Sequence, residues 1–205
     1  FVADRSMAFA RQPVYPNLIA LKPGKPVGQW RDSNEGIGRG RYPYDVNVVW
    51  VPAALHAIGR FLDAGLLDAY TTPAQRERLH AAVVGVGVWE SKAPALFDVR
   101  LDAQQAAGQV RAYATQVGVG DTAALASLDG KALAFPAISL DAQGHPVPVM
   151  HTDVGFELLF GTPGAATLDR LVGDVVRPFP AGLMTGVGMV VANPAYADRE
   201  VWPRF

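Results

Sequence analysis

The stretch GQWRDSNEGIGRGRYPYD, residues 28–45, leads directly into VNVVWVPAALHAIGRFLDAG, residues 46–65, and this passage from loop to helix indicates the fold. In the second part, Pro52 stands where a first-turn proline is tolerated, and apolar residues follow it at helical spacing until Gly65. The first part combines glycines with carboxylates, guanidiniums and aromatic rings. The sequence therefore predicts a helix over 52–64 that follows an irregular, polar segment.

Similar signals mark the other expected helices. Thr72-Pro73 is typical of a helix cap followed by a first-turn proline, and Asp102 is expected to cap a helix that Gly118 ends. Turn residues over 141–144 separate two apolar runs, which predicts a hairpin. The expected elements are helices over 52–64, 73–89, 103–117, 153–160 and 165–176, and a small β-hairpin near 132–150.

The arrangement of these elements predicts a mainly α fold with long loops that carry the chemistry. The first 50 residues show little helical periodicity and are expected to be irregular. No linker or repeat divides the chain, so residues 1–205 are expected to form a single domain. The last expected helix should bury four apolar side chains: Leu168, Leu171, Val172 and Val175.

The composition narrows the range of functions. The chain has 205 residues, half of them hydrophobic, and a net charge of only −1, so it lacks the basic footprint of a nucleic-acid-binding protein and a polybasic membrane patch. No apolar run approaches the roughly 20 residues of a membrane span. There is no cysteine, which excludes disulfides and thiolate metal sites. A periplasmic or secreted location is slightly favoured over the cytoplasm, and the ends of the chain indicate an incomplete domain or a processed product.

The loop over 28–45 is the strongest candidate site. Aromatic faces can stack on sugar rings, and fixed carboxylates can hydrogen-bond sugar hydroxyls or deliver a proton to a glycosidic oxygen. This mixture predicts a polyol-binding cleft, whereas the alternative is a polar loop held by Arg–Asp pairs. The candidate residues in this loop are Trp30, Arg31, Asp32, Glu35, Tyr44 and Asp45.

Two further places carry candidate residues. His151 and Asp153 could hydrogen-bond a ligand, although Asp153 as the cap of the following helix is the favoured alternative. A metal site is not expected there, because apart from His145 no further histidine lies near His151 in the sequence to complete a set of ligands. Trp202 lies in a loop and is the best sugar platform among the remaining tryptophans, since Trp50 and Trp89 are expected to be packing residues.

Four segments together resemble the six-hairpin glycosidase superfamily, in particular the amylo-glucosidase part of glycogen debranching enzymes and bacterial relatives. They are Trp30-Arg31-Asp32-Ser33, Arg41–Asn47 with Val51–Leu55, Met150–Phe156 and Pro178–Thr185. The resemblance implies a partial (α/α)6 toroid of helical hairpins whose loops form a sugar-binding funnel. It also implies hydrolysis of α-glucosidic bonds with inversion, in which the family's general acid falls on Asp32. No segment matches the family's general base, which is expected from the remainder of a parent chain or from a second chain.

The leading prediction is thus a glycoside hydrolase-like domain that acts on α-linked glucosyl or related oligosaccharides by acid/base chemistry and needs no cofactor. The first alternative is a carbohydrate-binding protein on the same helical toroid that does not turn its ligand over. The second is a polysaccharide lyase, for which Tyr42 or Tyr44 among three arginines would supply the base. In each case the expected partner is an oligosaccharide or polysaccharide, with no nucleic acid and no membrane.

Overall fold

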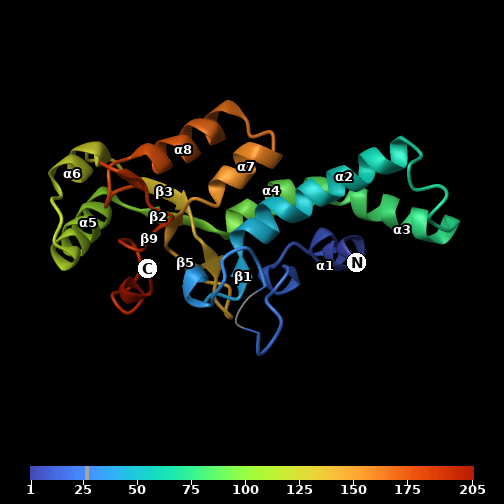
Figure 1. Ribbon diagram of the computed structural model, residues 1–205, viewed down its shortest axis with the longest axis horizontal. Helices are drawn as coiled ribbons and strands as arrows, with labels where there is room; N and C mark the ends of the chain where they lie inside the picture. The colour runs from blue at the N-terminus through green and yellow to red at the C-terminus, as the bar shows by residue number, and fades with distance from the viewer. Residues whose placement is uncertain (26–27) are drawn as a thin grey trace.

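The computed structural model describes residues 1–25 and 28–205, and the described chain is mainly helical, as expected (Figure 1). The α-helices are α1 (Val2–Arg11), α2 (Val51–Asp63), α3 (Pro73–Val84), α4 (Val86–Leu96), α5 (Ala103–Val117), α6 (Thr122–Leu128), α7 (Val154–Phe160) and α8 (Ala165–Val176). The shorter helical segments are η1 (Tyr15–Asn17), η2 (Glu35–Ile37), η3 (Asp45–Trp50) and η4 (Trp202–Arg204).

The strands are short, and each pairs antiparallel with another named strand. They are β1 (Tyr42–Pro43), β2 (Asp98–Leu101), β3 (Leu133–Pro136), β4 (Ser139–Leu140), β5 (Pro146–Val147), β6 (Met150–His151), β7 (Met184–Thr185), β8 (Gly188–Met189) and β9 (Ala192–Asn193). The expected hairpin is confirmed, because β4 pairs with β5 across a turn in which Gly144 has a φ of +84°. Three pairings between segments distant in sequence were not predicted: β1 with β4, β2 with β3, and β6 with β9.

The predicted helix boundaries are confirmed where local capping chemistry sets them. The Thr72 hydroxyl oxygen accepts a hydrogen bond from the backbone N–H of Gln75, and the Gln75 side-chain oxygen accepts one from the backbone N–H of Thr72. Asp102 and Gln105 form the same capping box at α5. Gly118 ends α5 in the left-handed conformation, with a φ of +71°. Each of these helices therefore begins or ends at the residue that its sequence signal marks.

The expected helix over 73–89 is divided at Gly85 into α3 and α4. A Cβ atom at Gly85 would lie 2.7 Å from the Cβ of Ala10, so this glycine permits a close approach to α1. Helix α1 itself corrects the expectation that the first 50 residues are irregular. Its buried side chains are Ala3, Ser6 and Phe9, and only the last of these gives a strong apolar signal in the sequence.

Helix α8 follows its predicted bounds, but it buries less of its apolar face than expected. Leu171 is fully buried, whereas Leu168 and Val172 are 41% and 38% exposed. The polar Asp174 is buried instead and pairs with Arg177 at 3.3 Å. Periodicity located the helix but did not show which part of its apolar stripe the rest of the chain covers.

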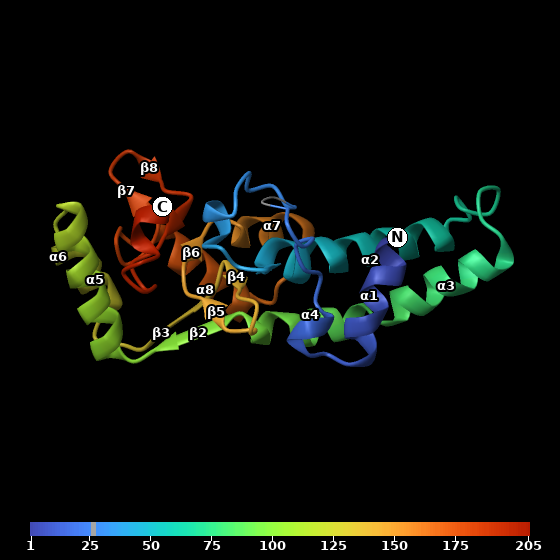
Figure 2. The same ribbon diagram turned by 90° about the horizontal axis from the view of Figure 1, so that it is seen from below.

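The buried side chains form two main cores. One lies among α1, α2, α3, α4 and η3 and includes Trp89, whose indole N–H donates to the Ser6 carbonyl. The other joins α5 and α6 to β3 and the C-terminal segment and includes Phe135. Figure 2 shows α5 and α6 at one end of the molecule and the α2–α3 hairpin at the other, with β2 and β3 running between them.

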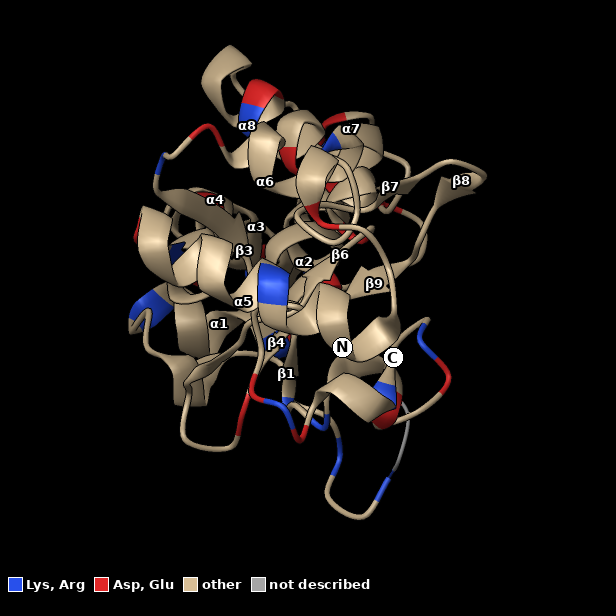
Figure 3. Cartoon of the chain, turned by 90° about the vertical axis from the view of Figure 1, so that its left-hand side faces the viewer, with Lys and Arg blue, Asp and Glu red and all other residues tan. Residues whose placement is uncertain are grey.

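The polar loop over 28–40, η3, β6 and the start of α7 meet between these two ends, where the candidate site lies. Acidic and basic residues are interspersed along the chain as seen in Figure 3. Among the described residues, no helix combines the length and the apolar character that crossing a membrane requires.

Candidate functional site

The centre of the candidate site is an ion pair between Arg31, in the polar loop, and Asp153, at the start of α7. The Nη2 atom of Arg31 lies 2.6 Å from Oδ1 of Asp153, and Nε lies 3.1 Å from Oδ1 and 3.2 Å from Oδ2. Nη2 also donates to the Val191 carbonyl oxygen at 3.0 Å. The side chains are only 6% and 1% exposed. Charge-assisted bonds of this geometry are strong and directional, so the pair fixes the loop against α7.

Asp153 occupies the N-cap position of α7, as the capping alternative predicted, but its side chain forms no capping hydrogen bond. The carboxylate is held by Arg31 instead, so it acts across the fold and not within its own helix. Burial alone would raise the pKa of Asp153, but His151 and Arg31 overcome this effect and hold the pKa well below its usual range. Asp153 therefore remains a carboxylate and cannot donate a proton at neutral pH.

His151 lies beside this pair and is fully enclosed. Its Nδ1 is 3.8 Å from Asp153 Oδ1, which is too long for a direct hydrogen bond, and within the described residues neither ring nitrogen has a hydrogen-bond partner. Its ring also meets the ring of Tyr44 edge-on, with centroids 5.0 Å apart. His145 lies elsewhere and pairs with Asp141 at 3.2 Å. The residues that the structure describes contain no cluster of three or more side chains suited to hold a metal ion.

Tyr44 and Asp45 add two further ionisable groups beside the Arg31–Asp153 ion pair. The Tyr44 hydroxyl donates to Oε2 of Glu157 at 2.6 Å, and burial followed by the nearby Glu157 charge raises the Tyr44 pKa well above its usual value. Burial, followed by the charge of Asp153, raises the pKa of Asp45 to about 6. Its Oδ2 accepts a 3.3 Å bond from the Trp50 indole, and its Oδ1 has no partner among the described residues. Asp45 can therefore hold a proton near neutral pH, although it is enclosed.

Trp30 and Asp32 flank the buried arginine and are both exposed. The Trp30 side chain is 48% exposed, and the guanidinium carbon of Arg31 lies 4.7 Å from its ring centroid. Asp32 has no ion pair or hydrogen bond with the part of the chain that the structure describes. The anchored Arg31 thus has an exposed aromatic ring before it and an exposed carboxylate after it.

The Trp30 ring begins a row of aromatic side chains that continues onto α7. Trp30 meets Phe156 edge-on at 5.7 Å between centroids, and Trp50 lies 4.9 Å from both Phe156 and Phe160. Trp50 therefore packs, as expected, against α7, while its indole N–H reaches Asp45. This row gives the exposed Trp30 ring a rigid support.

The remaining candidates lie apart from this cluster. Glu35 forms surface ion pairs with Arg39 at 2.6 Å and with Arg204 at 3.6 Å. Trp202 is buried in the second core, where its indole N–H donates to the Ala197 carbonyl and its ring meets Tyr113 at 5.1 Å. Because it is buried, Trp202 presents no face to a sugar, which corrects the expectation. Its position in a predicted loop did not indicate that the side chain would be buried.

The structure thus brings together Arg31, Tyr44, Asp45, His151 and Asp153, places Trp30 and Asp32 beside them at the surface, and separates Glu35 and Trp202. Glu157 belongs to the cluster but was not among the candidates. A signal was present, since Glu157 follows Asp153 by four residues and therefore lies on the same face of α7.

Comparisons of the chain with protein-family models, with curated proteins and with solved structures found no match.

Proposed function

We propose that this chain is part of a glycoside hydrolase domain that binds an α-linked glucosyl or related oligosaccharide against the loop over 28–36. The observation that supports this proposal is the anchored Arg31 with an exposed tryptophan before it and, after it, an exposed aspartate that pairs with none of the described residues. Trp30 would stack on a sugar ring, and Asp32 would protonate the glycosidic oxygen. Because Arg31 is fixed through Asp153, both neighbours would meet the substrate from a rigid backbone.

The helical part of the proposal is a partial (α/α)6 toroid. The consecutive helices α2 and α3 contact each other, as do α5 and α6, and two such pairs would supply hairpins of the toroid. Further hairpins and the general base would come from the remainder of a parent chain or from a second chain. An inverting mechanism would require that base about 6.5–9.5 Å from Asp32, with a water molecule between the two carboxyl groups.

A carbohydrate-binding protein without turnover is the second candidate, and the same exposed Trp30 favours it. The lyase alternative is less well supported, because Tyr44 is buried and its raised pKa opposes the loss of its proton. A lyase would reveal itself through the ultraviolet absorbance of an unsaturated product, which hydrolysis does not create.

The test uses the full-length protein, together with whatever part supplies the general base, its Asp32→Asn variant and a panel of α-linked glucosyl oligosaccharides. We expect the wild type to release reducing sugar and the variant to lose at least about 100-fold in rate while it still binds the sugar in calorimetry. Asp63→Asn, at the exposed end of α2, is the matched control and should keep full activity. Binding without release by the wild type would favour the binding protein, and unchanged turnover by Asp32→Asn would remove Asp32 from the mechanism.

A further inference from the structure

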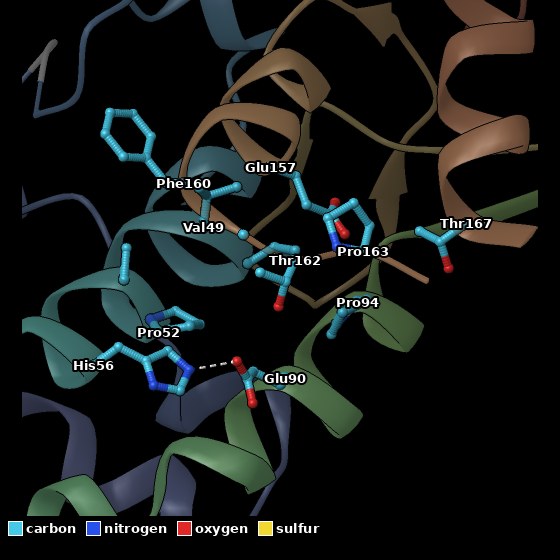
Figure 4. A pocket seen from close by; sticks show the side chains of 13 residues that line it. Val49, Pro52, His56, Glu90, Pro94, Glu157, Phe160, Thr162, Pro163 and Thr167 are labelled. Atoms are coloured by element: carbon cyan, nitrogen blue, oxygen red, sulfur yellow. Dashed lines mark hydrogen bonds and ion pairs between the residues drawn. The ribbon is translucent and has the colours of Figure 1, made fainter. Parts of the chain in front are cut away.

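A cavity of about 340 Å³ lies between η3, α2, α4, α7 and the segment that joins α7 to α8 (Figure 4). Its volume falls at the lower end of the range for small-molecule sites. Glu157 and Phe160 line both this cavity and the candidate site described above, but Asp32 and Trp30, which would contact the sugar, are not among the lining residues of the cavity. Two carboxylates, one imidazole and two threonine hydroxyls line it together with apolar side chains.

The first polar wall is a pair between His56 on α2 and Glu90 on α4. The His56 Nε2 and the Glu90 Oε1 lie 2.7 Å apart, and both side chains are about half exposed, at 47% and 50%. Figure 4 shows the pair at one side of the cavity, facing the segment that carries Thr162 and Pro163. This pair joins two helices and presents a carboxylate to the space between them.

The second polar wall is Glu157 on α7. Its Oε2 accepts the Tyr44 hydroxyl at 2.6 Å, which fixes the carboxylate, and its Oε1 has no hydrogen bond with the residues that the structure describes. Tyr44 is held in its protonated form by burial, so it supplies a proton to this bond and does not add negative charge. Glu157 is therefore a positioned acceptor with one oxygen left for a ligand.

The charges around the cavity have one predominant sign. Its lining contains Glu90 and Glu157 but no lysine or arginine, and His56 is already paired with Glu90. Arg170 acts on the nearby Tyr44, but it lies 3.9 Å from Asp98, which offsets its charge. Such a lining favours a cation over an anion of the same shape.

The remaining surface of the cavity is apolar and rigid. Pro52, Pro94 and Pro163 contribute rings whose conformations are fixed, and Phe160 contributes an aromatic face. A small apolar body would lose water-exposed surface there without ordering long, flexible side chains of the protein. Thr162 and Thr167 add hydroxyls that can orient a polar group.

We propose that this cavity binds a small ligand that carries a protonated amine on a compact apolar body. The ammonium group lies between Glu157 and Glu90, and the apolar body lies against the proline rings and Phe160. The site does not depend on hydrolysis at Asp32, and Asp32→Asn should leave it unchanged.

The test is isothermal titration calorimetry with three probes that share one ring: cyclohexylammonium, cyclohexanol and cyclohexanecarboxylate. We expect the ammonium probe to bind the wild type roughly tenfold or more tightly than the alcohol, because it gains a hydrogen bond to a charged group, and the carboxylate not to bind. Glu157→Gln and Glu90→Gln keep the shape of the cavity and should each weaken ammonium binding by roughly tenfold.

Glu77→Gln, on the exposed surface of α3, is the matched control and should bind like the wild type. Far-ultraviolet circular dichroism establishes that each variant is folded. The proposal is overturned if the wild type does not prefer the ammonium probe to the carboxylate probe. It is equally overturned if the preference survives unchanged in both cavity variants, since the cation would then bind elsewhere.

Discussion

Replacing Asp153 by asparagine should destabilise the protein strongly, because the change leaves the Arg31 guanidinium buried without its counter-charge. Both side chains are almost fully buried, and the pair is held by three short contacts. Removal of one partner of such a pair costs about 3–5 kcal/mol, which is a large share of the roughly 5–15 kcal/mol that stabilises an ordinary domain. Asparagine has nearly the volume of aspartate, so a cavity would not explain the loss.

The measurement is urea unfolding followed by circular dichroism, at several pH values. The folded-state pKa of Asp153 lies below its unfolded value, so the carboxylate stabilises the fold above about pH 4 and loses this effect as the pH falls. We therefore expect a large, constant difference between wild type and Asp153→Asn from about pH 7 to pH 8. Below that range the difference also reflects Asp45, whose pKa the Asp153 charge helps to raise to about 6, and in strong acid it shrinks as Asp153 itself is protonated. The double variant Arg31→Met/Asp153→Leu should recover much of the lost stability, since no unpaired charge remains.

Asp129→Asn is the control, because it removes the carboxylate of an exposed pair with Lys131. Its unfolding midpoint should differ little from that of the wild type. If Asp153→Asn unfolded at the same urea concentration as Asp129→Asn, Arg31 would not be held as described. The rigid support that we assign to Trp30 and Asp32 would then be lost as well.

Three other variants test a buried acid and the packing of two glycines. The raised pKa of Asp45 means that the folded protein binds a proton at this carboxyl more tightly than the unfolded chain does, so the free energy of unfolding should fall as the pH rises from about 4 to about 6. Asp45→Asn should remove roughly 3 kcal/mol of this pH dependence, as urea unfolding at several pH values would measure. An unchanged pH profile in the variant would contradict the prediction. Gly85→Ala should destabilise the fold, because the new Cβ would meet the Cβ of Ala10. Gly87→Ala has open space around the new Cβ and should stabilise α4 by up to about 1 kcal/mol, so the thermal unfolding midpoint should fall in the first variant and rise in the second.

The sequence predicted those parts of the fold that local chemistry determines. The capping boxes at Thr72 and Asp102 and the left-handed Gly118 lie within a few residues of the backbone groups they satisfy, so their signals are local. Helix α1 was missed because its buried face is formed largely by small residues. The pairing of β2 with β3 was missed for a different reason, since it joins segments more than thirty residues apart and no local signal specifies the partner.

The candidate site shows the same division. The residue types in the loop over 28–45 and in the run around His151 were recognised, but their partners were not. Arg31 meets Asp153 across 122 positions, and Tyr44 meets Glu157 across 113. Tertiary packing alone decides that Trp202 enters a core while Trp30 stays exposed. A sequence indicates which side chains can do chemistry, and the fold decides which of them meet.

The long chain separation of the Arg31–Asp153 pair also has a consequence for the order of folding. Closing such a loop costs entropy before the pair can form, so we expect the pair to form late, after the helices have docked. Its energy would then appear mainly in the unfolding rate and hardly in the folding rate. The contact that fixes the polar loop would therefore also slow the unfolding of the folded protein.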